Sequence, residues 1–235
     1  MTRTHVVTGA GSGIGAAVTR VLHERGDRLV LLARSTERAA ALEQAYAGAT
    51  TVVADLADAD GLERGLAEAE LPDRIDSLLH VAGVVDLAAV AEVDSASLRE
   101  QVQVNLVAPV LLTRACLPGL RAAPGVVVFV NSSAGLVAGP SWGAYAASKF
   151  GLRGLADSLR AEEVDHGVRV TTVFPSRTAT PMQEKVHEQE GRTYDASRWI
   201  RPETVADTIL HVLDLPADAT IPEVTVRPLV PRPGT

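Results

Sequence analysis

Tyr145 and Lys149 stand four residues apart in the segment Tyr-Ala-Ala-Ser-Lys, in a chain of 235 residues with three tyrosines and two lysines. Side chains at positions i and i+4 share one face of a helix, so this phenol and this ammonium can contact the same ligand. An arginine would not replace the lysine, because its charge is fixed and its head is a planar fork. The pair indicates proton transfer beside a positive charge, although such spacing also arises by chance.

A glycine-rich segment follows the first apolar run of the chain. Its residues are Gly9, Gly11, Ser12, Gly13, Ile14 and Gly15. Glycines let the backbone turn tightly and approach a pyrophosphate, and free N–H groups at the start of a helix favour its negative charge. We therefore predict a dinucleotide-binding loop, the other interpretation being a plain strand-to-helix turn.

The next two apolar runs end in residues that could select the nucleotide. Arg34 ends the second run, where an acidic residue would bind a ribose 2′-hydroxyl and a basic one would bind a 2′-phosphate. Arg34 therefore favours NADP over NAD, unless it is a solvated surface arginine. Asp55 and Leu56 follow the third run, and the Asp55 carboxylate either accepts from an adenine amino group or caps a helix.

The composition limits the class of protein. Hydrophobic residues make up 46% and charged residues 22%, as in ordinary globular domains. A formal net charge of −7 argues against nucleic-acid or membrane-surface partners. Cys116 is the single cysteine, and neither a signal peptide nor an uninterrupted apolar stretch of about 20 residues is evident. We expect a cytoplasmic protein without a metal.

Short apolar runs alternate with segments of helical spacing. The predicted strands are His5–Thr8, Leu29–Ala33, Thr51–Ala54, Ser77–Val81, Val126–Val130, Val168–Phe174 and Glu223–Arg227. The predicted helices are Ile14–Arg25, Thr36–Tyr46, Gly61–Ala69, Ser95–Leu120, Trp142–Val164 and Pro202–Leu213. This alternation predicts an α/β fold with a Rossmann-like doubly wound parallel sheet of about seven strands and helices on both faces, in three αβα layers. Residues 1–235 form one domain, with an irregular, mobile excursion near residues 180–200.

Two further motifs lie between the glycine loop and the Tyr145–Lys149 pair. The first is Asn105 in Val104-Asn105-Leu106-Val107-Ala108-Pro109, and the second is Asn131-Ser132-Ser133-Ala134-Gly135. In this order the four segments resemble the short-chain dehydrogenase/reductase family over nearly the whole chain.

The resemblance implies a role for each motif residue. Ser132 would bind the substrate oxygen, Tyr145 would be the general acid or base, Lys149 would support it, and Asn105 would hold a proton-relay water. Ser132 is chosen over Ser133 because the family's serine stands three residues before a glycine and thirteen before the tyrosine. Taken alone, Asn105 would be a helix kink or a buried amide bonded to backbone.

The proposed chemistry suits these residue types. A hydride that arrives on a carbonyl carbon leaves charge on the oxygen, and a donor must neutralise it. A phenol with a pKa near 10 is a poor base at neutral pH, so alcohol oxidation requires that its pKa be lowered. We expect the Lys149 ammonium to lower the Tyr145 pKa by attraction between opposite charges, and to reach the nicotinamide ribose.

The chain departs from the family pattern in two places. The first is His80-Val81-Ala82-Gly83, where the family commonly has Asn-Asn-Ala-Gly. Ala82 and Gly83 would still let the adenosine ribose approach closely. The His80 ring either replaces the hydrogen bonds of a missing amide or is a core histidine whose hydrogen bonds are satisfied. Pro175-Ser176 replaces Pro-Gly beside the nicotinamide. The other expected cofactor contacts there are Pro175, Thr178 and Thr180, of which Thr180 matches the family's carboxamide-binding threonine.

No motif identifies the substrate. Leu136, Trp142 and Met182 are the predicted pocket residues, with Val137, Tyr194 and Trp199 as further candidates. Such a pocket is mostly apolar, so we expect a neutral carbonyl compound or alcohol, while Arg177 either binds an anionic group or faces water.

Apolar residues on several faces of the two long helices favour the homodimer or homotetramer that the resemblance implies. The predicted function is that of an NADP(H)-dependent oxidoreductase. The alternative is an NADP(H)-binding redox-sensing regulator that keeps the fold without turnover. An epimerase or dehydratase is disfavoured, because little chain follows Phe174 for a substrate domain.

Overall fold

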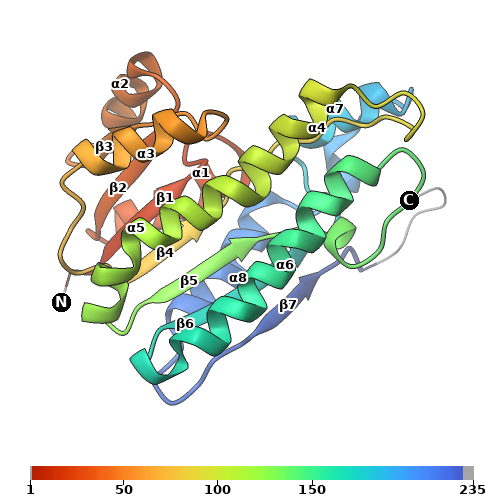
Figure 1. The fold of residues 1–235 in the computed structure, drawn as a ribbon. Coiled ribbons are helices and arrows are strands. Elements are labelled where there is room, and N and C mark those ends of the chain that lie inside the picture. Colours follow the sequence, from red (N-terminus) through yellow and green to blue (C-terminus); the bar gives the residue numbers. More distant parts are fainter. Residues whose placement is uncertain (1, 230–235) are drawn as a thin grey trace.

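A computed structural model describes residues 2–229 of the chain, which form one seven-stranded parallel sheet (Figure 1). The strands are β1 (Thr4–Thr8), β2 (Arg28–Ala33), β3 (Thr50–Val53), β4 (Ser77–His80), β5 (Val126–Val130), β6 (Arg169–Pro175) and β7 (Glu223–Val226). Their order is β3-β2-β1-β4-β5-β6-β7, with every neighbouring pair parallel. The order reverses beside β1, which opens a ligand crevice at the carboxyl ends of the strands. All seven predicted strands and the predicted fold class are confirmed.

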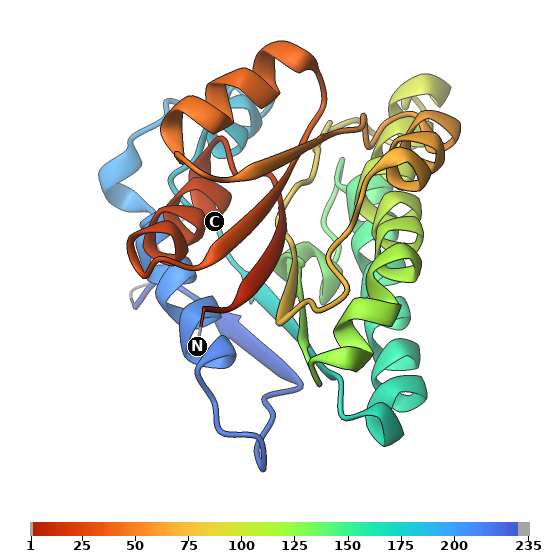
Figure 2. The ribbon, with the colours of Figure 1, turned by 90° about the vertical axis from the view of Figure 1, so that its left-hand side faces the viewer.

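Helices cover both faces of the sheet. They are α1 (Gly13–Glu24), α2 (Thr36–Ala45), α3 (Ala59–Glu68), α4 (Ser95–Val102), α5 (Ala108–Ala122), α6 (Gly143–Glu163), α7 (Pro181–Gln189) and α8 (Pro202–Leu213). Side chains of α1, α2 and α8 share one hydrophobic cluster, and those of α3, α5 and α6 share the other. Figure 2 shows the sheet between these two helical layers.

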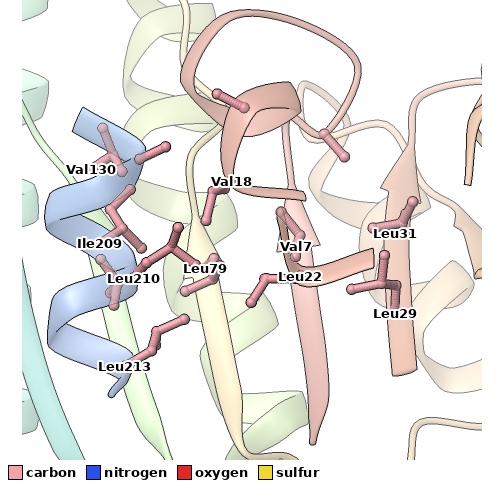
Figure 3. Packing of buried hydrophobic residues seen from close by; sticks show 14 of the residues in the cluster. Val7, Val18, Leu22, Leu29, Leu31, Leu79, Val130, Ile209, Leu210 and Leu213 are labelled. Carbon is pink, nitrogen blue, oxygen red and sulfur yellow. The ribbon is translucent and has the colours of Figure 1, made fainter. Parts of the chain in front are cut away.

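The two clusters explain why the strands are continuously apolar. In β5, Val128 and Val130 belong to the α1/α8 cluster, whereas Val127 and Phe129 belong to the α5/α6 cluster. Successive side chains of a strand point to opposite faces, so a central strand of a three-layer fold has no solvent-facing position. Figure 3 shows the first cluster, in which Ile209 of α8 lies near Val130.

The predicted helix Ser95–Leu120 is interrupted near its middle. Gln103–Val107 is a π-helical turn between α4 and α5, and the Ala108 N–H donates to the Gln103 carbonyl. Such turns often occur at functional sites, and Asn105 lies inside this one. By length and composition alone, the stretch Ser95–Ala122, with a window of mean hydropathy 1.2, could cross a membrane. Here it packs on the sheet, as core helices of the same composition also do.

The segment near residues 180–200, which we expected to be irregular, contains a helix that was not predicted, whereas residues 192–195 have no regular structure. It contains α7 and a 3-10 turn, Ala196–Arg198. The Thr180 hydroxyl accepts from the Gln183 N–H, and Pro181 occupies the first helical turn. Thr-Pro is a start signal for a helix, but the polar sequence that follows it did not predict one. The helix packs over Tyr145 through the buried side chain of Val186.

Candidate active site

The three residues predicted to act on the substrate meet where β5 ends and α6 begins. Ser132 follows β5 and caps a short 3-10 turn, and its hydroxyl oxygen accepts from the Ala134 N–H at 3.1 Å. Tyr145, in the first turn of α6, shares a hydrogen bond with Ser132. The Lys149 ammonium lies 5.8 Å from the centre of the Tyr145 ring. The carboxyl end of β5 therefore places the Ser132 hydroxyl, and the start of α6 places the Tyr145 phenol and the Lys149 ammonium beside it.

Burial dominates the electrostatics of this group. It raises the pKa of Tyr145 to about 12, although the hydrogen bond with Ser132 opposes the shift. Burial also lowers the pKa of Lys149 to about 8, and its ammonium donates to the Val130 carbonyl at 3.1 Å. The expectation that Lys149 lowers the Tyr145 pKa was therefore wrong for this structure. At neutral pH the phenol keeps its proton and can donate it.

The Asn105 side chain is bonded to protein atoms. Its Nδ2 donates to the Val84 carbonyl at 2.9 Å and to the Ser148 hydroxyl at 3.0 Å, and its Oδ1 accepts from the Val84 N–H at 2.9 Å. Both amide hydrogens are thus in use, which agrees with the interpretation as a buried amide bonded to backbone. Its part in holding a relay water stays a prediction.

Two residues that we did not single out hold Ser132, Tyr145 and Lys149 in place. Asn131 Nδ2 donates to the Lys149 carbonyl at 2.9 Å, and its Oδ1 accepts from the Ser132 N–H at 2.8 Å. The Ser148 hydroxyl donates to the Tyr145 carbonyl at 2.7 Å. Both residues lie inside the motifs themselves, next to Ser132 and Lys149, and this adjacency was the available signal.

His80 is a satisfied core histidine. Its Nε2 lies 2.9 Å from the Thr113 hydroxyl, and its ring stacks on Phe129 at 4.8 Å between centroids. Burial, with a smaller contribution from the charge of Lys149, lowers the pKa of His80 to about 3. The ring is neutral and fills the core, so it does not replace the family's amide at the surface of the crevice.

This burial makes His80 a source of acid sensitivity. The folded protein excludes a proton that the unfolded chain binds below pH 6.5, so stability falls by about 1.4 kcal/mol per pH unit from about 6.5 towards about 3. We expect His80→Asn to be less stable at neutral pH, because the stacking is lost, but to lose less stability on acidification. Urea unfolding at neutral and acidic pH measures this difference.

His211→Asn, at an exposed position of α8, is the control for the His80 variant. It should keep the acid dependence of the parent protein. An unchanged acid dependence in His80→Asn would contradict the assignment.

The glycine loop forms a cradle at the N-terminus of α1. The first turn of α1 has no acidic residue, and the Ser12 hydroxyl does not cap it. A Cβ on Gly15 would lie 2.0 Å from the Gly9 carbonyl oxygen, so that position requires glycine. A Cβ on Gly11 would meet only Leu42, at 3.9 Å, which leaves its outer side open to a ligand. These features fit a pyrophosphate, whose charge the free N–H groups favour.

The predicted nucleotide-selecting residues follow β2 and β3 at the same edge of the sheet. The Arg34 side chain is exposed and forms no hydrogen bond or ion pair within residues 2–229, so it is free to bind an anion. Asp55 Oδ1 accepts from the Ala57 N–H at 2.9 Å, whereas Asp58 is the N-terminal cap residue of α3. The helix-cap interpretation of Asp55 was therefore wrong, and its adenine role stays a prediction.

The β4 loop packs against the glycine loop. Val81 and Ala82 donate their N–H groups to the Thr8 hydroxyl at 3.0 and 3.1 Å. Ala82 and Leu56 line one small cavity of about 10 Å³. A Cβ on Gly83 would lie 3.6 Å from Lys149 Nζ. The segment that contains Ala82 and Gly83 thus lies between the glycine loop and Lys149.

The residues that follow Pro175, at the carboxyl end of β6, lie at the same edge of the sheet as the glycine loop. The Ser176 N–H donates to the Val226 carbonyl at 2.9 Å, which extends the pairing with β7. Thr178 is buried, and its hydroxyl donates to the Ser176 carbonyl at 2.9 Å. A Cβ on Gly13 would lie 2.9 Å from Thr180 Cγ2, so Thr180 borders the glycine loop. Thr180 is therefore next to the glycine loop, whereas the cofactor contacts of Pro175 and Thr178 stay predictions.

Two of the three predicted pocket residues lie near Tyr145. Trp142 and Met182 pack in the cluster that contains Tyr145, and the Trp142 and Tyr145 rings are 5.8 Å apart with one edge facing the other. Leu136 is half-buried and does not belong to that cluster. Arg177 neither faces water nor stands free for an anion, because its guanidinium pairs with both oxygens of Glu190. Both interpretations of Arg177 were wrong.

Comparison with known proteins agrees with this geometry. The sequence model for short chain dehydrogenases matches residues 3–191. The chain is 32% identical to dehydrogenase/reductase SDR family member 7B of Bos taurus over 80% of its own length and 62% of that protein. It is 31% identical to L-xylulose reductase of Bos taurus over 90% of its own length and 88% of that protein.

A solved structure shows the same fold. The alcohol dehydrogenase from Thermococcus sibiricus, complexed with 5-hydroxy-NADP, superposes with a TM-score of 0.85 at 24% identity, over 100% of both chains. Three of the curated relatives are longer than this chain, which spans 18%, 62% and 55% of their lengths. The family match covers most of the chain, and the predicted catalytic and nucleotide-binding motifs lie at one edge of the sheet. The chain belongs to the short-chain dehydrogenase/reductase family.

Proposed function

We propose that the protein interconverts a carbonyl compound, either a ketone or an aldehyde, and an alcohol by hydride transfer, with NADP(H) as its preferred cofactor. The observation that carries this proposal is the convergence of Ser132, Tyr145 and Lys149 beside the open glycine loop. The bound nicotinamide supplies or takes up the hydride. The chain supplies the proton and the site that receives charge on oxygen.

Each side chain has a separate task. The Ser132 hydroxyl and the Tyr145 phenol share a hydrogen bond and each has one O–H, so a substrate oxygen that replaces this bond would accept from both. Tyr145 then donates its proton to the oxygen that gains charge. Lys149, with a pKa of about 8, is mostly protonated at neutral pH and places a positive charge near the phenol. Because the Tyr145 pKa of about 12 disfavours the phenolate, the free protein is better prepared for carbonyl reduction than for alcohol oxidation.

The cofactor preference rests on Arg34. An exposed guanidinium with no protein partner within residues 2–229, at the end of β2, suits a 2′-phosphate better than a hydroxyl. The relative named as an L-xylulose reductase supports the reductase class. The apolar surroundings of Trp142 and Met182 favour a neutral small-molecule substrate over an anionic one.

We also propose that residues 1–235 act as one catalytic domain in the cytoplasm, as a homodimer or homotetramer without nucleic-acid or membrane partners. Val110 on α5 and Phe150 on α6 are 39% and 44% exposed, and these helices form the outer layer on one side of the sheet (Figure 1). Pairing of this apolar face with a second copy would bury both side chains.

A substrate screen with both cofactors tests the function. We expect carbonyl compounds to be reduced with NADPH, and Arg34→Ala to weaken NADPH binding by about tenfold or more while NADH binding changes little. Binding assays by cofactor fluorescence measure both affinities. Arg38→Ala, at an exposed position of α2, is the control. Equal affinity of the parent for NADPH and NADH would refute the preference, and NADPH binding without any turnover would favour the redox-sensing alternative.

A further inference from the structure

An ion pair that the proposed reaction does not use lies beside Trp142, one of the predicted pocket residues. The Arg177 guanidinium donates to the two Glu190 carboxylate oxygens at 2.9 and 2.6 Å. Their side chains are only 17% and 15% exposed. Burial raises the Glu190 pKa, but hydrogen bonds from Arg177 and the charges of Arg177 and Arg192 outweigh it and hold that pKa below its ordinary value. Glu190 therefore stays ionised, and the positive charge of Arg177 is neutralised within the protein.

The same guanidinium contacts both tryptophans of the chain. Its Cζ atom is 5.9 Å from the centre of the Trp142 ring and 5.5 Å from the centre of the Trp199 ring. We call Arg177, Glu190, Trp142 and Trp199 the arginine clamp. Planar guanidinium groups stack on aromatic faces, which an ammonium does less well because it is compact and strongly hydrated. The Arg177 head thus restrains two indole rings and one carboxylate at once.

The clamp joins four segments that are separate in the chain. Arg177 follows β6, Glu190 ends α7, Trp142 precedes α6 and Trp199 follows the 3-10 turn. A carboxylate at a helix C-terminus is disfavoured by the helix dipole, and the pairing with Arg177 offsets that cost. The end of α7 is therefore tied to the segment after β6 and to the start of α6, which carries Tyr145.

Trp142 connects the arginine clamp to Tyr145, the proposed proton donor. The Trp142 ring lies against the Arg177 guanidinium, and its centre is 5.8 Å from the centre of the Tyr145 ring. The indole therefore contacts both the clamp and the catalytic phenol. Any shift of Arg177 changes the position of the apolar ring that a substrate at Tyr145 would meet.

We infer that Arg177, held by Glu190, is a positioning residue that fixes Trp142 as an apolar wall beside Tyr145, and that the pocket selects carbonyl compounds whose substituent at this wall is uncharged. This inference rests on the proposed function. It names a substrate class, because a carboxylate at the wall would meet an indole ring and a guanidinium already paired with Glu190, and its desolvation would go uncompensated.

Matched substrates and variants test the inference. The substrates are an α-keto ester and the corresponding α-keto acid, and the variants are Arg177→Lys and Glu190→Gln. Arg121→Lys is the control, since Arg121 makes an equivalent two-oxygen contact with Glu163, at 2.9 and 2.6 Å, without contacting either tryptophan. We expect the parent to prefer the ester by about tenfold or more in kcat/KM.

The variants should separate binding from chemistry. Arg177→Lys should raise KM for the ester by about tenfold while kcat changes little, because the wall moves but Ser132, Tyr145 and Lys149 remain. Glu190→Gln leaves the Arg177 charge unpaired, so the preference for the ester over the acid should fall by about tenfold. A parent enzyme that reduces the acid as well as the ester would overturn the substrate class.

Tryptophan fluorescence tests the positioning without any turnover. Because Trp142 and Trp199 are the two tryptophans of the chain, all indole emission comes from the clamp. Arg177→Lys should shift that emission to longer wavelength in the folded protein, and Arg121→Lys should not. Identical spectra for the two variants would overturn the positioning role. Absence of turnover with every carbonyl compound would instead overturn the proposed function, and the substrate class with it.

Discussion

Replacement of Tyr145 with phenylalanine is expected to lower kcat for carbonyl reduction by about 1,000-fold, because the proton donor is removed. The ring itself is buried with Val186 and Ala134 and contacts Trp142, so phenylalanine should keep the local packing. The lost hydrogen bond with Ser132 should cost about 1 kcal/mol of stability. Steady-state kinetics, together with NADPH binding by fluorescence, separates loss of chemistry from loss of binding.

Tyr194→Phe is the matched control for this substitution. Tyr194 is half-buried and its ring lies 5.3 Å from that of His187. Because Tyr194 was only a candidate for the substrate pocket, its replacement should keep nearly the parent kcat, and any effect should fall on KM. If Tyr145→Phe also kept the parent rate on an accepted substrate, Tyr145 would not be the proton donor.

The Tyr145 pKa of about 12 also sets the sign of the pH dependence. Oxidation of an alcohol requires a deprotonated phenol, so its rate in the parent should rise with pH through the alkaline range. Reduction requires the protonated phenol, which is the dominant form at neutral pH. Tyr145→Phe should remove the alkaline rise in oxidation along with most of the rate.

The second large effect is expected for Gly15→Ala. The new Cβ would lie 2.0 Å from the Gly9 carbonyl oxygen and 3.2 Å from the Ala10 nitrogen, so the glycine loop must move. Overpacking against backbone should lower the free energy of unfolding by about 3 kcal/mol. Displacement of the phosphate cradle by about 1 Å should reduce activity by about 100-fold or more. Urea unfolding and NADPH titration measure the two losses.

Gly11→Ala separates the two roles of a loop glycine. Its Cβ would meet only Leu42 at 3.9 Å, so the unfolding free energy should match that of the parent or rise slightly. NADPH binding should nevertheless weaken, because the added methyl group occupies the side from which the phosphates approach. Gly15→Ala with the stability of the parent would show that the loop tolerates a shift and is not a rigid cradle.

The sheet could be predicted from the sequence because its strands are buried on both faces. Five consecutive apolar residues, Val126–Val130, read as a buried strand, and the structure places alternate members in the two hydrophobic clusters. The glycine loop and the Tyr145–Lys149 spacing were equally local signals, since a turn and one helical face each depend on residues close in the chain. These parts of the site are brought together by parallel strands that all end at one edge.

Other features were beyond a local pattern. The π-helical turn at Gln103–Val107 follows no periodicity, and the Asn105 amide inside it bonds to Val84, 21 residues away. The helix α7 was missed because its polar sequence hides an apolar contact: Val186 packs on Tyr145, and Lys185 donates to the Val85 carbonyl, 100 residues away. Contacts between such distant residues cannot be found from spacing.

The sequence by itself indicated the candidate catalytic residues and the alternation of strands and helices that predicts a parallel sheet, because periodicity and glycine positions act over short distances. Only the tertiary structure decided the pKa values of these side chains and the residues that surround them. The Tyr145 pKa rises because α7 and its neighbours bury the phenol, which no motif expresses. Arg177 is likewise committed to Glu190 and two indole rings, because folding joins four separate segments at that guanidinium.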